Sequence, residues 1–424
     1  MNKTEWCRAC RELAEAQTRL PGDSVPVLRD ALAALDRLAR AAPWDVRAAY
    51  TKLSEAELSR DARSHAAAIE RGTLAWPHKA VGHLRALGAI AIQIRAVDAL
   101  LGDLNSRANR APALSAREWC TSSRDAYVIP SRRRRDLGSV DGDRLGYDRR
   151  GTLRHRIIPT TLGGMPVRPV AIGSLDAAAE ERPVTVGAAL FPGLTLGTKS
   201  SGKGFVADEV SHPDLPGAVA RQVDALADAH AIVWPELTVD DDGLEAIQGA
   251  LAARAFEVGT AVNVVVAGTW HRPRGARTFN LAPVLDGTGD QKAEYAKVVP
   301  FAHDELGWEG IAQGNRLLVL VCDRFLAAVA ICKDFCDLGV TPPWESLDVD
   351  LMLVPSMGGS TTMAGHLARA GQNAIGRDQR VVVAQHGAPR KEGDPKGFAL
   401  LGSRRPPADP AAFGRDDEWG SAPL

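Results

Sequence analysis

Two patterns of apolar positions divide this chain of 424 residues. In the first hundred residues, apolar side chains recur at every third or fourth position. They include Leu28, Leu32, Leu35 and Leu38, and then the stripe from Val81 to Leu101. This spacing gathers the side chains on one helix face and predicts a helical bundle over residues 1–105. Further along, short apolar runs alternate with helical stretches, which predicts an α/β domain over residues 183–390. Residues 391–424 are rich in glycine and proline and are expected to form a tail.

An arginine-rich region, residues 106–182, connects the two predicted domains. Residues 106–160 hold thirteen arginines against six acidic residues, and the densest run is Arg132–Arg135. Arginine favours phosphate contacts, so one interpretation is that residues 107–156 bind nucleic acid. We favour a linker or irregular subdomain, either solvated or packed on an acidic neighbour. The region has little aromatic interleaving and no recognised nucleic-acid module.

Composition narrows the possible classes of protein. The formal net charge of -1 does not indicate a molecule that binds polyanions over its whole surface. Six cysteines in so long a chain, with no basic and apolar leader, do not indicate a secreted disulfide framework, so a cytoplasmic location is expected. No apolar run approaches the roughly 18 residues of a membrane span. Cys7-x-x-Cys10 lacks a second pair at metal-binding spacing, so neither a metal nor a cofactor is expected.

Three chemically capable side chains lie at or near the ends of predicted strands. Cys332 follows the apolar run Ala327–Ile331, and Glu236 follows the run Ala231–Pro235. Lys297 lies among apolar neighbours, although lysine is rarely buried without a partner. Open α/β folds place their ligands at the carboxyl ends of strands. At such an edge the three residues can supply a nucleophile, a proton acceptor and a positive charge for an oxyanion.

Each of these residues also has an ordinary structural explanation. A free cysteine usually behaves as a small buried hydrophobe. Glu236 could be a carboxylate at a helix N-terminus, and Lys297 could protect an edge strand from aggregation. Finding all three residue types in this order favours a hydrolase.

The order Glu236, Lys297 and Cys332, with the short motifs around it, resembles the nitrilase superfamily of carbon–nitrogen hydrolases. The matching segments are Pro235-Glu236, Gly268-Thr269-Trp270-His271, Asn280, Val284-Leu285-Asp286-Gly287, Tyr295-Ala296-Lys297, Ile331-Cys332-Lys333-Asp334, Leu351 to Ser356 and Arg380 to Ala384. The similarity covers residues 184–390. The evidence for the resemblance is the order of several motifs, because each motif alone is a weak signal.

The resemblance implies an α/β fold, a four-layer α-β-β-α sandwich of the nitrilase type, here preceded by an all-α domain, and a homo-oligomer that is commonly a dimer. It implies that Cys332 attacks an amide or nitrile carbon and that Glu236 takes the thiol proton. Lys297 and the backbone N–H of Lys333 would face the oxyanion. Glu305 lies eight positions after Lys297, near the family's second glutamate, and is expected to hold Lys297 or position substrate.

The chain departs from the family after the cysteine, where Lys333 stands in place of the usual aromatic residue and Asp334 comes next. Its small-molecule substrate is therefore expected to be an amide or carbamoyl compound, with nitriles as poor substrates. The charged Lys333 and Asp334 predict a polar or ionised substrate. His271, Arg272 and Arg277 follow a strand near the same edge and are candidates to contact a substrate carboxylate. The alternative is a catalytically idle module whose helical and arginine-rich half binds a protein or nucleic acid.

Overall fold

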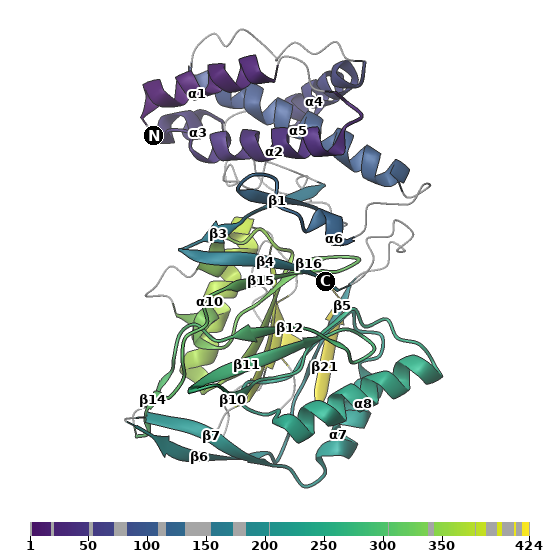
Figure 1. The fold of residues 1–424 in the computed structure, drawn as a ribbon, viewed down its shortest axis with the longest axis vertical. Coiled ribbons are helices and arrows are strands. Elements are labelled where there is room, and N and C mark those ends of the chain that lie inside the picture. The colour runs from purple at the N-terminus through teal and green to yellow at the C-terminus, as the bar shows by residue number, and fades with distance from the viewer. Residues whose placement is uncertain are drawn as a thin grey trace. The chain divides into compact units, whose positions relative to one another are not determined.

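The computed structural model describes most of the chain. The described residues are 2–17, 21–50, 54–71, 83–108, 116–131, 154–172, 184–202, 204–303, 305–337, 343–377, 379–386, 397–400, 411–412 and 418–423. Internal contacts divide the chain into two units. One comprises residues 1–160 and 175–178, and the other comprises residues 161–174 and 179–424. Helices dominate the first unit, and mixed strands and helices form the second (Figure 1).

The first unit is a helical bundle, as the apolar pattern predicts. Its helices are α1 (Lys3–Ala16), α2 (Val25–Arg40), α3 (Trp44–Tyr50), α4 (Glu55–Glu70), α5 (His83–Ala108) and α6 (Ala116–Trp119). The leucine stripe of α2 is buried in one core with Leu87, Ile90 and Ile94 of α5. Trp6 of α1 is buried in the same core and donates its indole N–H to the carbonyl of Leu38 at 2.8 Å. The apolar faces of the helices therefore cover one another.

Two strands from the predicted linker belong to this helical unit. β1 (Ala126–Pro130) pairs antiparallel with β2 (His155–Pro159), and Val128 and Ile157 join the helical core. The carboxylate of Asp98 accepts the backbone N–H of His155 at 3.0 Å, which ties β2 to α5. Part of the region expected to be irregular is therefore ordered by packing on helices. Arg132–Arg135, and most of the segment considered for nucleic-acid binding, lie outside the described residues.

The second unit contains two large sheets. One has the strand order β20-β19-β18-β17-β16-β15-β4-β3. Its strands are β3 (Thr161–Leu162), β4 (Met165–Ala171), β15 (Leu317–Val321), β16 (Leu326–Val329), β17 (Leu351–Met357), β18 (Arg380–His386), β19 (Gly397–Leu400) and β20 (Ala411–Ala412). The other has the order β10-β11-β9-β8-β5-β21, with β12 also paired to β11. Its strands are β5 (Thr185–Ala189), β8 (Ala231–Val233), β9 (Val264–Val266), β10 (Trp270–Arg274), β11 (Arg277–Leu285), β12 (Gln291–Ala296) and β21 (Trp419–Pro423).

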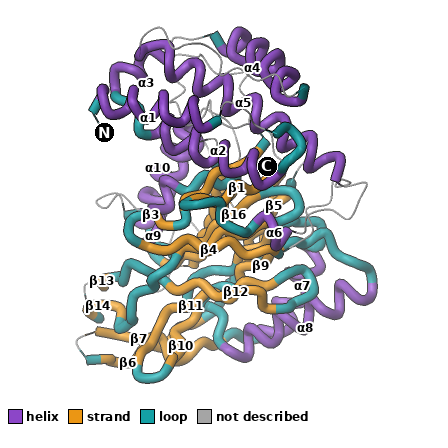
Figure 2. The backbone as a smooth tube through the Cα atoms, turned by 45° about the horizontal axis from the view of Figure 1, so that its top comes forward, coloured by secondary structure: helices purple, strands orange, loops and turns teal. Residues whose placement is uncertain are grey.

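Helices cover the outer faces of these two sheets. β5 and β8 of one sheet contact β17 and β18 of the other, so the sheets pack face to face. α7 (Leu215–Ala225) and α8 (Asp241–Glu257) bury their apolar faces against β8 and β9. On the other side, α10 (Ser360–Arg377) contacts β18 and β19. Figures 1 and 2 show α10 and the α7–α8 pair on opposite sides of the strands. The predicted four-layer α-β-β-α sandwich is confirmed.

A smaller sheet of four strands stands beside these layers, and the apolar pattern does not predict it. Its order is β13-β14-β7-β6. The strands are β6 (Thr195–Ser201), β7 (Gly204–Ser211), β13 (Ala302–His303) and β14 (Gly307–Glu309). β7 pairs antiparallel with β6 and parallel with β14, and it contacts β10 of the larger sheet. The sheet therefore connects the loop after β5 with the segment after β12.

The strands that carry the candidate residues end as the sequence predicts. β15 and β16 form the expected antiparallel hairpin, which leads to Cys332. β16, β17 and β18 run parallel, and so do β5, β8 and β9. Their apolar runs are buried on both faces, which is typical of parallel strands between layers. The short helix α9 (Lys333–Cys336) starts directly after Cys332.

The second unit extends beyond the predicted domain at both ends. β4 pairs parallel with β15, although residues 165–171 lie in the predicted linker, where their two prolines weaken a strand prediction. β3 pairs only with the start of β4, so Pro169 lies where no ladder hydrogen bond is needed on that side. At the other end, β21 adds to β5, and β19 adds to β18. The predicted tail therefore supplies strands to both large sheets.

Candidate active site

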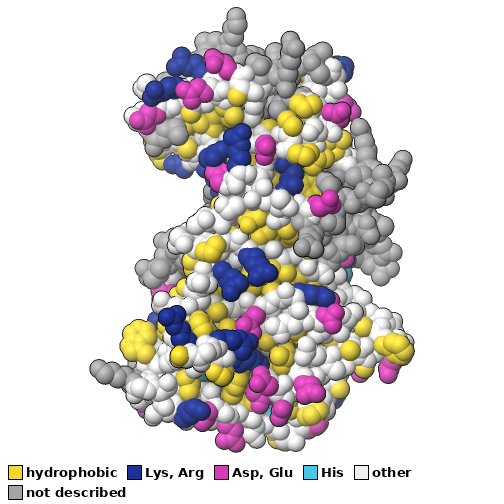
Figure 3. Space-filling model, viewed as in Figure 1, with side chains coloured by type: hydrophobic (Ala, Val, Ile, Leu, Met, Phe, Trp, Pro, Cys, Tyr) yellow, Lys and Arg dark blue, Asp and Glu magenta, His cyan; other side chains and the backbone are white. Residues whose placement is uncertain are grey.

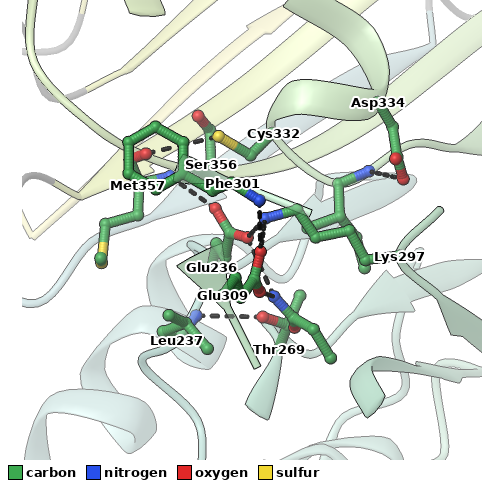
Figure 4. Close-up of polar contacts among 12 residues, drawn as sticks. Glu236, Leu237, Thr269, Lys297, Phe301, Glu309, Cys332, Asp334, Ser356 and Met357 are labelled. Atoms are coloured by element: carbon green, nitrogen blue, oxygen red, sulfur yellow. Dashed lines mark hydrogen bonds and ion pairs between the residues drawn. The ribbon is translucent and has the colours of Figure 1, made fainter. Parts of the chain in front are cut away.

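Glu236 lies at the carboxyl end of β8, where the chain turns out of the sheet. Its side chain is 2% exposed and accepts hydrogen bonds from three groups. Lys297 Nζ donates to Oε1 at 2.7 Å, Asn280 Nδ2 donates to Oε1 at 3.0 Å, and the backbone N–H of Met357 donates to Oε2 at 3.1 Å. Donors from three elements therefore fix the orientation of this carboxylate (Figure 4).

The backbone after Glu236 turns through a left-handed conformation. Leu237 has a φ of 54°, which is rare for a residue with a side chain, and its N–H donates to Thr269 Oγ1 at 3.0 Å. Gly268 packs against this corner with a φ of +56°, and a Cβ atom there would lie 2.7 Å from the carbonyl oxygen of Pro235. The close approach explains the glycine of the Gly-Thr-Trp-His segment.

Lys297 follows β12 and lies between two carboxylates. Its Nζ donates to Glu236 at 2.7 Å and to Glu309 at 2.6 Å, while the side chain is 1% exposed (Figure 4). Burial alone would lower the pKa of Lys297, but the two carboxylates outweigh it and hold this pKa well above its ordinary value. The lysine is therefore a fixed cation. An ammonium carries three N–H groups, so one remains after these two bonds.

Glu309 holds Lys297, and the prediction that Glu305 does so is wrong. Glu305 is exposed in the turn between β13 and β14, whereas Glu309 ends β14 and is buried. The four groups around Glu309 all donate: Lys297 Nζ at 2.6 Å, Asn280 Nδ2 at 2.8 Å, Phe301 N–H at 2.9 Å and His271 Nε2 at 3.0 Å. Burial raises the pKa of Glu309, but Lys297 and then His271 outweigh it and lower the pKa to about 2.

His271 and Asn280 support the carboxylates from neighbouring strands. The N–H of Ala207 donates to His271 Nδ1 at 2.7 Å, so the ring proton lies on Nε2 and faces Glu309. Asn280 Nδ2 bridges Glu236 and Glu309. Arg272 donates to Asp241 at 2.8 Å. The expectation that His271 and Arg272 would bind a substrate carboxylate is therefore corrected, because these side chains are engaged within the protein.

Cys332 sits at a strained corner between β16 and α9. Its φ of 44° and ψ of -104° are unusual for a residue with a side chain, and its N–H donates to the carbonyl of Pro355 at 2.8 Å. The thiol is 2% exposed and lies 3.4 Å from the carbonyl oxygen of Met357. In Figure 4 the sulfur lies on the same side of the site as the Glu236 carboxylate and the Lys297 ammonium. The structure thus brings the three predicted residues together.

The positions of Lys333 and Asp334 do not support the prediction that these residues contact a substrate. Lys333 Nζ lies 5.6 Å from the centroid of the Trp308 ring and 4.0 Å from Asp337 Oδ2. Asp334 is fully buried and accepts the Val299 N–H at 2.7 Å and the Tyr295 hydroxyl at 2.9 Å.

Asp334 instead ties together the segments that carry Lys297 and Cys332. It also accepts the backbone N–H groups of Val298 at 3.1 Å and Ile331 at 3.2 Å. Burial raises the pKa of Asp334 to about 7, against the opposing effect of these donors and of Lys297. Asp334 therefore has a structural role.

Replacing Asp334 by alanine is expected to lower the free energy of unfolding by about 3 kcal/mol, because several buried donors lose their acceptor. Urea denaturation of the full chain measures the change. Glu305→Ala, at an exposed position, is the control and should change stability by less than about 0.5 kcal/mol. Equal stability of the two variants would contradict the structural assignment of Asp334.

A cavity of about 760 Å³ opens above these residues. Glu236, Lys297 and Glu309 line its floor together with Met357. Its walls come from the loop after β5, from the β6–β7 hairpin and from the segment that leads into α10. Cavities of this size hold drug-sized molecules. Glu236, Lys297 and Glu309 therefore line a site large enough for a substrate, while Cys332 is buried beside Met357 of that lining.

The pKa shifts in the site distinguish Glu236, a proton acceptor, from Cys332, a proton donor. Burial first, and then the negative charge of Glu309, raise the pKa of Glu236 well above its ordinary value, against the opposing effect of Lys297. The neighbouring Cys336 thiol and burial raise the pKa of Cys332, while Lys297 opposes them. The thiol is therefore protonated at rest, and a carboxylate of raised pKa is a better base for its proton.

Sequence reasoning missed Glu309, and one signal could have found it. Asp304 and Glu305 form an acidic pair typical of a turn, whereas Glu309 is the lone charge between Leu306 and Gln313. An isolated charge among uncharged residues more often has a buried partner.

Neither a metal centre nor a membrane span is found in the described part of the chain. No group of three His, Cys, Asp or Glu side chains there could hold a metal ion. None of the described helices is long and apolar enough to cross a bilayer. On the face shown in Figure 3, acidic and basic side chains are interspersed over the second unit.

Comparisons with known proteins give likenesses of structure alone. No family model matches the sequence, and no curated protein matches it. Among solved structures, an amidase from Nesterenkonia sp. is 15% identical over 58% of this chain and 92% of its own, with a TM-score of 0.40. A mutant of the Nesterenkonia AN1 amidase, described as from the nitrilase superfamily, is 16% identical over 57% of this chain and 92% of its own, with a TM-score of 0.40. The chain is similar to these amidases, and its function is inferred from the side chains of the site.

Proposed function

We propose that this chain is a carbon–nitrogen hydrolase that acts on amide or carbamoyl compounds and not on peptide bonds. The observation that carries the proposal is the buried Lys297, held between Glu236 and Glu309 at the floor of a cavity. Burying a cation and two carboxylates costs free energy unless they pair with one another. Buried charged groups with shifted pKa values are concentrated at functional sites. Cys332 at its strained corner supplies the nucleophile for this arrangement.

In the first half of the reaction the Cys332 sulfur attacks the amide carbon while its proton passes to Glu236. The carbonyl oxygen becomes an oxyanion, which the third N–H of Lys297 and the backbone N–H of Lys333 stabilise. When the tetrahedral intermediate collapses, the carbon–nitrogen bond breaks. The nitrogen takes the proton from Glu236 and leaves as ammonia or an amine. A thioester on Cys332 remains.

In the second half, water takes the place of the amine. Glu236, again ionised, removes one proton from the water as its oxygen attacks the thioester carbon. The carbon–sulfur bond then breaks and the thiolate of Cys332 recovers its proton from Glu236. The products are the acid and free enzyme. Amides are preferred to nitriles because a nitrile must add water twice before acid is released.

An activity screen of the purified full chain tests the proposal. Ammonia release would be measured with neutral amides, ureido compounds, N-carbamoyl amino acids and nitriles. We expect turnover of at least one amide or carbamoyl compound, with an acyl adduct on Cys332 visible in the intact mass at early times. A nitrile turned over as fast as the best amide would overturn the preference, and no turnover in any class would overturn the activity.

A second candidate is a module of the same fold that binds a ligand without turnover. The burial of Cys332, whose thiol contacts the Met357 carbonyl, favours it. Alkylation separates the two, since a poised thiol reacts and a structural thiol does not. We expect iodoacetamide to label Cys332 at least about tenfold faster than the buried Cys322, read by peptide mass spectrometry. Equally slow labelling of both would favour the idle module.

A further inference from the structure

The walls of the cavity are far more apolar than its floor. Phe191, Leu194, Leu196, Phe205 and Leu306 line the walls, drawn from the loop after β5, the β6–β7 hairpin and the β13–β14 turn. The uncharged Thr195, Thr198 and Thr362 add polar positions. Among the described lining residues, the acidic and basic side chains other than those of His303 and His386 are Glu236, Lys297 and Glu309, which already pair with one another. A charged substrate group would find no partner of opposite sign in this set.

Three rings form a row along one wall. His303 of β13 meets Phe205 of β7 with centroids 6.4 Å apart and Phe301 with centroids 6.3 Å apart, both edge to face. The backbone N–H groups of Glu305 and Leu306 donate to His303 Nδ1 at 3.2 and 3.3 Å. His303 Nδ1 therefore accepts hydrogen bonds from the backbone, and the imidazole presents an aromatic ring with one polar edge. Aromatic edges and faces of this kind favour a flat apolar ligand.

We propose that the substrate is an uncharged amide with a large apolar acyl group, of the size and flatness of an arylalkyl chain, held by the β6–β7 hairpin and the ring row Phe205–His303–Phe301. The inference deepens the proposed function, and it replaces the ionised substrate that the sequence predicted. Removing apolar surface from water favours binding in proportion to the area buried, and a carboxylate buried without a partner is strongly disfavoured. Size and charge should therefore both decide selectivity.

Three probes test the wild-type chain. They are acetamide, 3-phenylpropanamide, and the same phenyl amide with a para carboxylate. We expect kcat/KM for 3-phenylpropanamide to exceed that for acetamide by at least about 100-fold, because the ring is buried in the cavity. Adding the carboxylate should lower kcat/KM by at least about 100-fold. A carboxylate probe turned over as well as its parent, or acetamide preferred, would overturn the inference.

A single charge placed in the wall gives a sharper test. Thr198 is exposed in β6 and lines the cavity, so Thr198→Lys adds a cation there with little effect on folding. It should shift the ratio of kcat/KM values at least about tenfold toward the carboxylate probe. Ser211→Lys, at an exposed position of the same hairpin outside the cavity lining, is the matched control and should leave the ratio unchanged. An equal shift in both variants would contradict recognition by the cavity.

Binding distinguishes this inference from the proposed activity. Calorimetric titration of the Cys332→Ala full chain measures the Kd of each probe without any turnover. If no amide is hydrolysed but the neutral phenyl amide binds at least about tenfold tighter than its carboxylate, the hydrolase proposal fails and the cavity inference stands. If amides are hydrolysed but the carboxylate probe binds as tightly, the cavity inference fails alone.

Discussion

Replacing Cys332 by alanine is expected to reduce turnover of the best amide by at least about 10⁴-fold, because the thioester route then has no nucleophile. Glu236 and Lys297 would remain, so we expect only slow residual hydrolysis, which depends on stabilisation of the oxyanion alone. Steady-state ammonia release measures the loss. The acyl adduct should also vanish from the intact mass.

Cys322→Ala is the matched control for this variant. Cys322 also follows a strand of the β15–β16 hairpin and is 1% exposed, and burial raises the pKa of its thiol well above the ordinary value. It lies in the turn that joins β15 to β16, at the opposite end of β16 from Cys332, so kcat should stay within about twofold of the wild-type value. If Cys332→Ala kept a tenth of the wild-type turnover, or if both variants lost activity together, the nucleophile would be misassigned.

The sequence could predict the three central residues because buried strands leave a simple pattern. A short apolar run needs no polar partners, so the first polar side chain after it marks the edge of the sheet. Glu236 follows β8 in this way. Lys297 follows β12, which holds Gln291, Lys292 and Glu294, and it is marked instead by the apolar residues around it. Lys297 Nζ then lies 2.7 Å from Glu236, although 61 positions separate the two residues. β8 and β12 belong to one sheet, which brings the residues that follow them to the same region of the domain.

The second carboxylate could not be assigned because its position depends on a turn. β13 and β14 are two and three residues long, and the register between them places His303 opposite Gly307. This register leaves Glu305 at the exposed tip and directs Glu309 inward. Such short strands have no periodicity to read, and spacing from Lys297 favours neither glutamate on physical grounds.

The roles of Lys333 and Asp334 depended on side-chain direction, which spacing does not reveal. Both come directly after the nucleophile, so the sequence predicts that both lie beside a substrate. Asp334 instead turns back to the Val298 and Val299 N–H groups, which lie beyond the end of β12 and need an acceptor outside the sheet. The apolar cavity walls are equally hidden in sequence, since they come from three separate segments.

Replacing Glu309 by glutamine is expected to lower kcat by about 100-fold, because Lys297 loses one of its two carboxylates. All four groups around this carboxylate donate hydrogen bonds. A glutamine can accept with its oxygen only, and its amide N–H₂ would face another donor. The mismatch should displace Lys297 from the oxyanion position although the side chain keeps its size.

The pH profile separates this electrostatic role from a general loss of structure. Glu236 must be ionised to accept the thiol proton, so kcat/KM falls as pH decreases through its pKa. Burial and the charge of Glu309 raise the pKa of Glu236, so the wild-type acid limb should lie above the ordinary glutamate value of about 4.3. Glu309→Gln removes this charge, and the acid limb should move to lower pH.

Glu305→Gln completes the comparison, because it makes the same chemical change four positions away on the exposed turn. Its kcat and its acid limb should match those of the wild-type chain within error. Urea denaturation of both variants checks that the fold persists, and the rate of Cys332 alkylation reports the site when turnover is low. A large loss in Glu305→Gln with none in Glu309→Gln would restore the spacing-based assignment and refute the one drawn from the contacts of Lys297.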